Sequence, residues 1–288
     1  MPMKSQEPVA PDGAALDHAV VNVGSRLDEA AEIYRGLGFS LTDRGHHTIG
    51  SSNHLAMFRT TYLELLGYEP QKGPVTAGLL SGPSGLNGLA LKTRDADGLY
   101  RALAASGLAV EPPASFSRPV ELAHETRHAS FKVIWLERGT VPFGRVFFCE
   151  HVTPELVWRP EWQEHANGAL DIAHVTIAAA DPIRSAQAVQ RLIGLGAWRE
   201  TADGIDIGLG TAELRIRSPA TVRHRLGASW NEDAVETDRM VGLGIRSRSL
   251  QAVEHALSAA GIAVADRRDD TVVVAGVDAL GVVLEFVA

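Results

Sequence analysis

The sequence is poor in cysteine, in long apolar runs and in clustered basic residues, and each absence excludes a class of protein. Cys149 is the only cysteine among 288 residues, which excludes an intramolecular disulfide framework and a cysteine-based zinc cluster and is typical of a reducing compartment. No apolar run approaches the roughly 18–20 residues that span a bilayer. The 27 lysines and arginines are scattered through a chain of net charge −8, so no basic stripe is present for nucleic acid. We therefore expect a cytoplasmic protein without nucleic-acid or membrane partners.

The chain start and the glycine-rich segments exclude further classes. The first 13 residues, MPMKSQEPVAPDG, carry charge and proline where a secretory signal needs an apolar segment, and they predict a disordered leader. The segments GLLSGPSG and GLGTAEL lack the endings of phosphate-binding and dinucleotide-binding loops. Hydrophobic residues make up 45% of the chain, which is enough for sizeable cores. Cys149 lies in an apolar run and is interpreted as a core residue.

One pattern occurs four times along the chain: an apolar strand, a helix opened by Asp or Ser, a glycine stop and further short strands. The four copies begin at LDHAVVNV, LNGLALKT, IAHVTIAA and VGLGIRSR. In the third copy, Asp181 and Pro182 supply an N-cap and a first-turn proline, and Gly196 is the expected helix end. In the fourth copy, Ser249 caps the helix and Gly261 stops it.

The ratio of strands to helices predicts the fold class. Each helix is followed by two or three strand candidates, such as LAMFRT and YLELLG. This ratio, with short hairpins, favours an α+β fold over a doubly wound parallel sheet. We predict four βαβββ modules paired into two curved-sheet domains, 14–165 and 166–288, because one four-stranded sheet cannot bury its concave face alone. Longer connections are expected at about 67–86, 111–127, 152–169 and 218–238.

Several motifs of the first 165 residues resemble a known family. The DH pair in LDHAVVNV, the segment GHHTIGSSNHLAMF with YLELLG, and FFCEHVTPELVWRPEWQ are similar to the glyoxalase-like domain family of the vicinal oxygen chelate superfamily. At the level of modules the resemblance covers nearly the whole chain. It implies a divalent metal inside a cup of two modules, held by His, Gln or Glu from the first and last strands of the modules. Such a metal chelates two adjacent substrate oxygens and stabilises an enolate-like anion.

The resemblance assigns the metal-ligand positions of the first module to His18 and Glu64. In the second module Gly88 replaces the first-strand ligand, so the other ligand must come from CEHV. Glu150 and His151 are neighbours there, and a regular strand directs only one of them inward. Laying FFCE over TYLE favours Glu150, whereas His151 completes a set of two histidines and one glutamate, and we favour His151. The predicted metal ligands are therefore His18, Glu64 and His151, and they do not discriminate among Zn, Ni, Mn and Fe(II).

The C-terminal half carries His174 and Glu285 at the corresponding positions, with Arg215 and Gly242 as their companions. An arginine in place of a ligand repels a cation, and two ligands are too few for tight binding. We predict that this half is degenerate and structural. A second metal site is the alternative.

Other polar residues are candidates for catalysis or substrate binding. His47 and Asn53 are predicted to lie in a loop over the cup mouth, as a proton shuttle and an oxygen-binding donor. A solvated hairpin loop is the alternative. Arg127 and Arg159 are candidates for holding a substrate carboxylate by a two-pronged contact, and an interdomain salt-bridge network is the alternative for both.

Together these residues predict a metal-dependent enzyme of the lyase or isomerase type. It acts on a small oxygen-rich organic molecule, with Glu64 or His47 moving a proton beside a carbonyl. An Fe(II)-dependent ring-cleaving dioxygenase is the rival enzyme, and a metal-free protein that binds or sequesters small molecules is the alternative outside enzymes. Four modules in one chain provide two complete pairs, so we expect a monomer or a homodimer.

Overall fold

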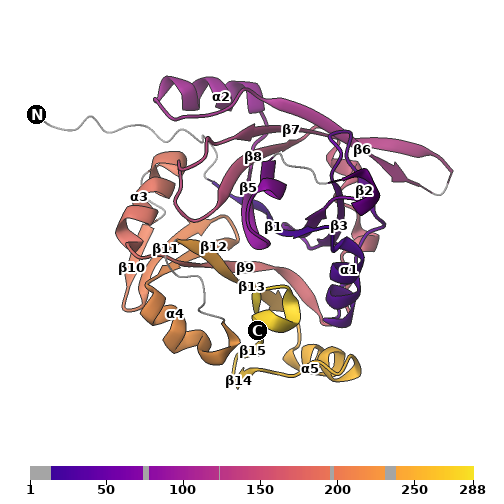
Figure 1. The fold of residues 1–288 in the computed structure, drawn as a ribbon, viewed down its shortest axis with the longest axis vertical. Helices are drawn as coiled ribbons and strands as arrows, with labels where there is room; N and C mark the ends of the chain where they lie inside the picture. The colour runs from indigo at the N-terminus through magenta and orange to yellow at the C-terminus, as the bar shows by residue number, and fades with distance from the viewer. Residues whose placement is uncertain (1–13, 74–77, 123, 195–197, 231–237) are drawn as a thin grey trace, which may run out of the picture.

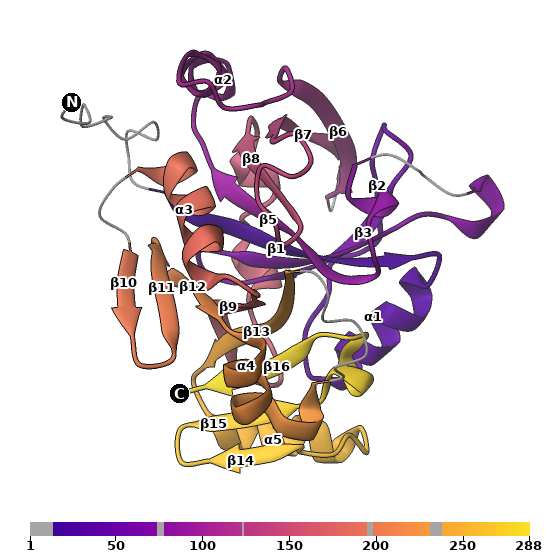
Figure 2. The same cartoon turned by 60° about the vertical axis from the view of Figure 1, so that its left-hand side comes forward.

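The computed structural model describes residues 14–73, 78–122, 124–194, 198–230 and 238–288. Within them the chain forms two eight-stranded curved sheets, one from each half of the sequence. Figures 1 and 2 show the N-terminal sheet, in indigo to magenta, above the C-terminal sheet, in orange to yellow. The predicted α+β fold of paired modules is confirmed. The predicted leader, 1–13, lies outside the described residues.

The N-terminal sheet joins two four-stranded modules edge to edge. Its strands are β1 (Leu16–Gly24), β2 (Gly45–His46), β3 (Ser52–Met57), β4 (Tyr62–Gly67), β5 (Gly85–Lys92), β6 (Ala114–Glu121), β7 (Thr126–Trp135) and β8 (Arg145–His151). They lie in the order β2-β3-β4-β1-β5-β8-β7-β6, so the two modules meet at the antiparallel pair β1 and β5. The prediction missed β6, which occupies part of the connection expected at 111–127. Its Pro119 reads as a strand breaker, and an edge strand tolerates it.

The C-terminal sheet repeats this order. Its strands are β9 (Ala169–Ala178), β10 (Trp198–Thr201), β11 (Gly204–Leu209), β12 (Ala212–Arg217), β13 (Arg239–Ser247), β14 (Asp266–Arg268), β15 (Thr271–Val274) and β16 (Val283–Val287). The antiparallel pair β9 and β13 joins its two modules, as β1 and β5 do in the first sheet. The first sheet ends at His151 and the second begins at Ala169, and the predicted boundary at 165/166 falls between them.

A helix follows the first strand of each module and covers the outer face of the sheets. These helices are α1 (Leu27–Gly36), α2 (Ala96–Ala105), α3 (Pro182–Ile193) and α5 (Leu250–Ala259). Asp181 and Ser249 each accept a backbone N–H at their N-caps, as predicted. Helix α3 ends at Gly194, whose φ is +85°, and the expected stop Gly196 lies outside the described residues. None of the described helices is long and apolar enough to cross a membrane.

A further helix, α4 (Pro219–Leu226), lies in the connection expected at 218–238. Ser218 caps it, and the Ser-Pro pair is a helix-start signal that the prediction missed. Val222 and Leu226 of this helix pack with Trp230 against the inner face of the C-terminal sheet. The C-terminal cup is therefore filled by the chain's own side chains. Short 3₁₀ turns complete the connections: η1 (Pro70–Lys72), η2 (Gly78–Ser81), η3 (Pro154–Leu156), η4 (Pro160–Trp162), η5 (Gly227–Ser229) and η6 (Gly276–Ala279).

One hydrophobic core joins the outer faces of the two sheets. Phe39 of the first half stacks on Phe286 of the second, with ring centroids 5.9 Å apart. Asp171 adds polar contacts between the halves, because its Oδ1 accepts from the Thr61 backbone N–H at 2.9 Å and from the Thr61 hydroxyl at 2.6 Å. The shared core leaves the inner, concave face of each sheet as the place for a site.

Candidate functional site

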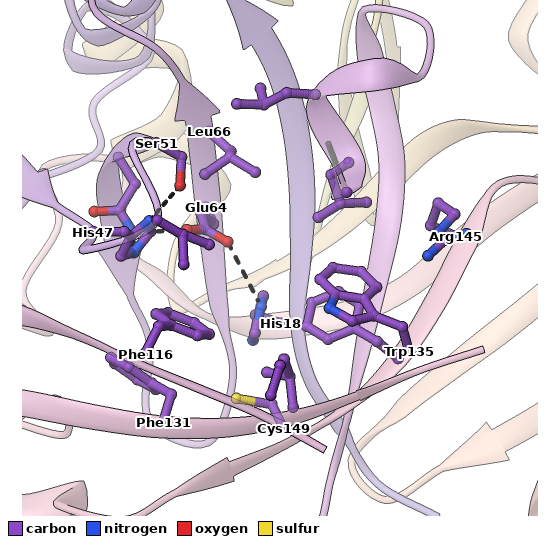
Figure 3. Close-up of a pocket in the computed structure, with 18 of the residues that line it drawn as sticks. His18, His47, Ser51, Glu64, Leu66, Phe116, Phe131, Trp135, Arg145 and Cys149 are labelled. Atoms are coloured by element: carbon purple, nitrogen blue, oxygen red, sulfur yellow. Dashed lines mark hydrogen bonds and ion pairs between the residues drawn. The ribbon is translucent and has the colours of Figure 1, made fainter. Parts of the chain in front are cut away.

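The inner face of the N-terminal sheet encloses a cavity of about 710 Å³, a size typical of small-molecule sites. Inward side chains of β1, β3, β4, β6, β7 and β8 line it, because residues along a strand alternate between the two faces. The sheet curls so far that its two ends meet, and the Thr48 N–H donates to the Ser117 carbonyl at 3.0 Å. Aromatic side chains form much of the wall. Figure 3 shows Phe116, Phe131 and Trp135, and Phe147 also lines the cavity.

A histidine and a glutamate face each other at the cavity floor. His18 Nε2 of β1 lies 3.7 Å from Glu64 Oε2 of β4 (Figure 3), and both side chains are buried. The His18 ring stacks on Tyr62, with centroids 4.2 Å apart, which fixes its plane. The structure thus brings together the two ligand positions predicted for the first module.

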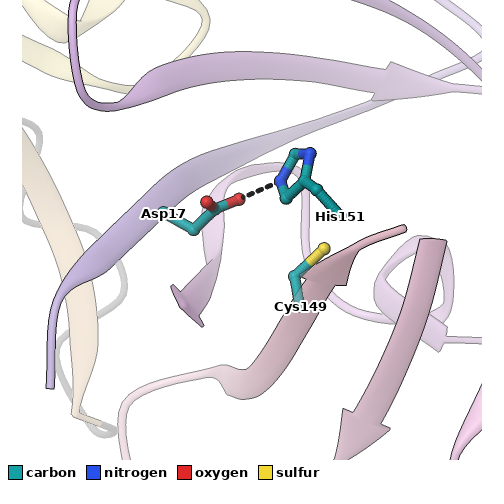
Figure 4. A group of neighbouring side chains, drawn as sticks. All are labelled: Asp17, Cys149 and His151. Carbon is teal, nitrogen blue, oxygen red and sulfur yellow. Dashed lines mark hydrogen bonds and ion pairs between the residues drawn. The ribbon is translucent and has the colours of Figure 1, made fainter. Parts of the chain in front are cut away.

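Asp17 orients His18 from behind. The pairing of β1 with β5 shifts between Leu16 and His18, so Asp17 is an extra residue in the strand. Its Oδ2 lies 2.7 Å from His18 Nδ1. The same oxygen lies 2.8 Å from His151 Nε2, the contact that Figure 4 shows. Burial by itself would raise the pKa of Asp17, but contacts with His151 and His18 hold that pKa well below its ordinary value. The ionised carboxylate only accepts, so His18 carries a proton on Nδ1 and presents Nε2 to Glu64.

Asn53 orients Glu64 from the other side. Its Nδ2 donates to Glu64 Oε1 at 2.6 Å and also contacts His47 Nε2 at 3.2 Å. His47 Nε2 is therefore an acceptor, and Nδ1 donates to the Ser51 hydroxyl at 2.8 Å. His47 lies in the turn between β2 and β3, as predicted, whereas Asn53 lies within β3 instead of the expected loop. One polar chain thus runs from Ser51 to the cavity floor.

Burial lowers the pKa of His47 from 6.5 to about 4, so its ring is neutral at physiological pH. Between these two values the unfolded chain binds a proton that the folded protein does not. Stability that is present above pH 6.5 is therefore lost as the pH falls, and the loss is complete near pH 4. We expect His47→Asn to reduce the drop in unfolding free energy between pH 7.5 and pH 5 by about 2 kcal/mol.

Urea unfolding at the two pH values measures this difference. The exposed His128 offers a matched control, because His128→Asn removes an imidazole that the fold does not bury. An equal pH dependence in His47→Asn and wild-type protein would contradict the buried neutral state of His47.

The structure places His151 and Glu150 apart from Glu64. His151 Nε2 binds Asp17 instead, and Glu150 Oε2 accepts the Ala96 N–H at the start of α2, 2.8 Å away. The strand registers explain this: Val20 pairs with Glu64 in the first module, and Ala90 pairs with Phe147 in the second. Because Val20 and Ala90 hold equivalent places in the two modules, the counterpart of Glu64 is Phe147, which carries no ligand atom.

The first-strand position of the second module also lacks a ligand. Gly88 stands there, and a Cβ on it would lie 2.6 Å from Leu79 Cδ2. Leu79 thus occupies the space that a ligating side chain from this position needs. Catalytic metal sites commonly use three protein ligands, whereas the cavity floor offers two, His18 and Glu64.

One other group of described residues places three possible ligand atoms within 4.8 Å of one another: Asp17, Cys149 and His151 (Figure 4). Asp17 Oδ2 already accepts from two imidazoles. Burial raises the pKa of the Cys149 thiol well above its ordinary value, which keeps the thiol protonated. Neither this group nor the pair at the cavity floor fits a resident metal ion, and no step below uses one.

The arginines predicted to hold a carboxylate lie outside the cavity. Arg127 Nη2 lies 3.4 Å from Glu155, and both side chains are exposed. Arg159 pairs with Glu161, and its guanidinium lies 5.4 Å from the centre of the Trp162 ring. Both contacts stay within the N-terminal half and do not join the two sheets.

Three other arginines line the cavity: Arg118 of β6, Arg138 and Arg145. Of these, Arg118 is the one that is deeply buried without a partner among the described residues. The sequence prediction missed it. Its side chain is 3% exposed, and its Nε and Nη2 have no hydrogen-bond partner among the described residues. Burial lowers the pKa of its guanidinium, which Tyr62 and Glu64 partly counteract. Had residues 114–121 been predicted as a strand, the alternation of side chains along it would have made Arg118 a candidate for the cavity wall.

In the C-terminal cup the corresponding residues bind one another. His174 Nε2 lies 3.0 Å from Glu285 Oε2, and Arg215 Nη1 lies 3.5 Å from the same nitrogen. Burial lowers the pKa of His174, and the histidine contact lowers that of Glu285 against the effect of burial. With α4 over this group, only a narrow space is left beside it.

Comparisons with known proteins agree with this architecture. A family model described as glyoxalase-like domain matches residues 16–193, more than half of the chain. A search of curated proteins finds no match. A hypothetical protein from Staphylococcus aureus superposes with a TM-score of 0.65 at 12% identity, over 95% of this chain and 98% of that one. A triple mutant of 4-hydroxymandelate synthase from Streptomyces coelicolor gives a TM-score of 0.58 at 10% identity, over 97% and 92%.

A fusion protein of a xylose isomerase-like TIM barrel and 4-hydroxyphenylpyruvate dioxygenase gives a TM-score of 0.55 at 12% identity, over 97% of this chain and 50% of that one. At these identities the likeness to solved structures is one of fold. The family match rests on the sequence itself, and it covers the cavity, its floor, and β9 and α3 of the second half. The chain therefore belongs to the glyoxalase-like domain family of the vicinal oxygen chelate superfamily.

Proposed function

We propose that the N-terminal cup is the active site of an enzyme that moves a proton on a small oxygen-bearing organic molecule. One observation carries the proposal: His18 Nε2 and Glu64 Oε2 face the same cavity 3.7 Å apart. Buried partners hold each group from behind, Asp17 for His18 and Asn53 for Glu64. Paired acid and base groups of this kind typically accelerate proton transfer by about 10²–10⁴-fold.

The arrangement gives each group a role in the reaction. Glu64 takes a proton from the carbon beside the substrate carbonyl, the C–H electron pair forms a C=C bond, and the π pair of the carbonyl moves onto its oxygen. A proton on His18 Nε2 passes to that oxygen while Asp17 accepts from Nδ1. After Glu64 has exchanged its proton with water, it protonates the same carbon while His18 takes back the proton of the oxygen, which gives exchange. With a hydroxyl on that carbon, Glu64 can instead protonate the former carbonyl carbon while His18 takes the hydroxyl proton, which gives isomerisation.

Two alternatives are less well supported by the donor set. Fe(II)-dependent oxygen chemistry commonly uses two histidines and one carboxylate on one ion, and the cavity floor brings together one of each. A sequestration protein needs the cavity but not a histidine and a glutamate held toward each other. A metal-dependent form of the proton transfer would need a third protein ligand beside His18 and Glu64, and the described residues bring none to the cavity floor.

Deuterium incorporation from D₂O tests the proposal. Phenylpyruvate, 2-hydroxyacetophenone and 2-oxobutanoate serve as probes, and proton NMR follows the signal beside each carbonyl. We expect exchange above the buffer rate for at least one probe. Glu64→Gln should lower that rate by about 100-fold or more, because the amide cannot accept the proton. Glu155→Gln, on the exposed surface, is the matched control and should keep the wild-type rate.

The same assay separates the alternatives. No exchange with any probe, or a rate that Glu64→Gln leaves unchanged, would overturn the proposed function. Protein dialysed against chelator should keep its rate. A rate that falls on dialysis and returns with Mn, Fe, Ni or Zn would instead support the metal-dependent form.

A further inference from the structure

We infer that Arg118 recognises a carboxylate group on the ligand of the N-terminal cavity, and that the rest of this ligand is apolar. This ligand class belongs to the proposed active site, and it rests on the proposed function only because both concern the same cavity. Arg118 is buried, lines the cavity, and has no carboxylate oxygen within 4.0 Å among the described residues. A buried cation without an anionic partner is costly unless a ligand supplies one.

The two free atoms of Arg118 specify the kind of anion. Nε and Nη2 carry the parallel N–H groups along one edge of the guanidinium, and neither has a partner in the described part of the chain. Two parallel donors match the two oxygens of a carboxylate. The other arginines that line the cavity are engaged: Arg145 Nη2 lies 3.5 Å from Glu111, and Arg138 donates to the Gly78 carbonyl at 3.1 Å.

The surroundings of Arg118 hold it in place. Gly45 of β2 packs against its stem, and a Cβ at Gly45 would lie 2.9 Å from Arg118 Cδ and overlap Asn53 Oδ1. Because Asn53 also binds Glu64, the anion site and the base share one support. A carboxylate held by Arg118 is thus placed next to the groups that move the proton.

The cavity walls indicate the rest of the ligand. Phe116 stacks on Phe131 with centroids 5.2 Å apart, and Trp135 lies 4.3 Å from Phe147. Flat apolar walls of this kind bind an apolar or aromatic body. The ligand class is therefore a small organic acid, with its charge at Arg118 and its body along the aromatic wall.

Calorimetric titration at pH 7.5 tests the inference with phenylacetate, its neutral amide phenylacetamide, and benzylphosphonate. We expect wild-type protein to bind phenylacetate at least about tenfold more tightly than the amide. Arg118→Gln should weaken phenylacetate binding by about 20-fold or more and change amide binding by less than about threefold. Arg118→Lys keeps the positive charge but loses the parallel pair of N–H groups. Its affinity for phenylacetate should lie between those of wild-type protein and Arg118→Gln.

Two further variants make the result specific. Gly45→Ala keeps the charge but displaces the Arg118 stem, and it should also weaken phenylacetate binding. Arg127→Gln removes an exposed charge outside the cavity and should leave it unchanged. Thermal unfolding by circular dichroism checks that each variant is folded. If Arg118→Gln does not fold, the affinity of Arg118→Lys for phenylacetate decides the test.

Several outcomes would overturn the inference. One is that wild-type protein binds phenylacetate and phenylacetamide equally well, or binds phenylacetate not at all. Another is that Arg127→Gln weakens phenylacetate binding as much as Arg118→Gln does. A third is that benzylphosphonate binds more tightly than phenylacetate. The titration needs no turnover. Binding that depends on Arg118 without deuterium exchange would therefore leave this inference in place and overturn the proposed function alone.

Discussion

Replacing Gly244 by alanine is expected to lower the free energy of unfolding by about 3–5 kcal/mol. Gly244 lies opposite His174 in the β9–β13 pair, and a Cβ at this position would overlap the His174 ring. The ring must therefore turn away, which breaks its 3.0 Å contact with Glu285. A buried carboxylate then loses its partner, and breaking a buried pair in this way is strongly destabilising.

Gly208→Ala is the matched control for Gly244→Ala. Gly208 also lies in a strand of the C-terminal sheet, but its Cβ would meet nothing within 4 Å. Alanine there should raise the unfolding free energy by up to about 1 kcal/mol, because glycine in a strand loses more backbone entropy on folding. Urea unfolding of the three proteins measures both changes. A loss below about 1 kcal/mol in Gly244→Ala would contradict the packing of His174 over this residue.

The second large effect concerns the core between the two halves. Phe286 is fully buried and stacks on Phe39 of the other half, so Phe286→Ala leaves a cavity in the shared core. We expect a loss of about 3–5 kcal/mol. Because the core is continuous, we also expect wild-type protein and variant each to unfold in a single transition.

Val277→Ala controls for the loss of apolar side-chain atoms as such. Val277 is 87% exposed, and its replacement should change the unfolding free energy by less than about 0.5 kcal/mol. Unfolding followed by tryptophan fluorescence and by far-UV circular dichroism measures the transitions. Two separated transitions in the wild-type protein, or a variant that destabilises one half alone, would contradict a single shared core.

Local signals in the sequence predicted the modules because they depend on near neighbours. The N-caps at Asp181 and Ser249 and the alternating strands each depend on a few consecutive residues. His18 and Glu64 were singled out for a related reason, since the resemblance rests on short motifs, LDHAVVNV and YLELLG, that fix the place of each residue in its strand. The same signals missed α4, although its Ser218 cap and Pro219 were present.

In the second module, local patterns did not predict which residue corresponds to Glu64. Alternation leaves Glu150 and His151 equally eligible, and overlaying the sequence of β4 on that of β8 misplaces the counterpart of Glu64. The register between β5 and β8 depends on hydrogen bonds between segments far apart in sequence, and it selects Phe147. A one-residue change of register exchanges the faces of a strand, so small errors here change the ligand set completely.

The sequence by itself determined four modules, their pairing into two curved sheets, and a histidine and a glutamate at one cavity floor. Only the tertiary structure decided what surrounds them. The extra residue in β1 lets Asp17 contact His151 of β8 as well as His18. The curl of the sheet brings Arg118 of β6 next to Gly45 of β2, and α4 fills the second cup. These features depend on contacts between segments distant in the chain, and no local pattern of residue types encodes a contact of that kind.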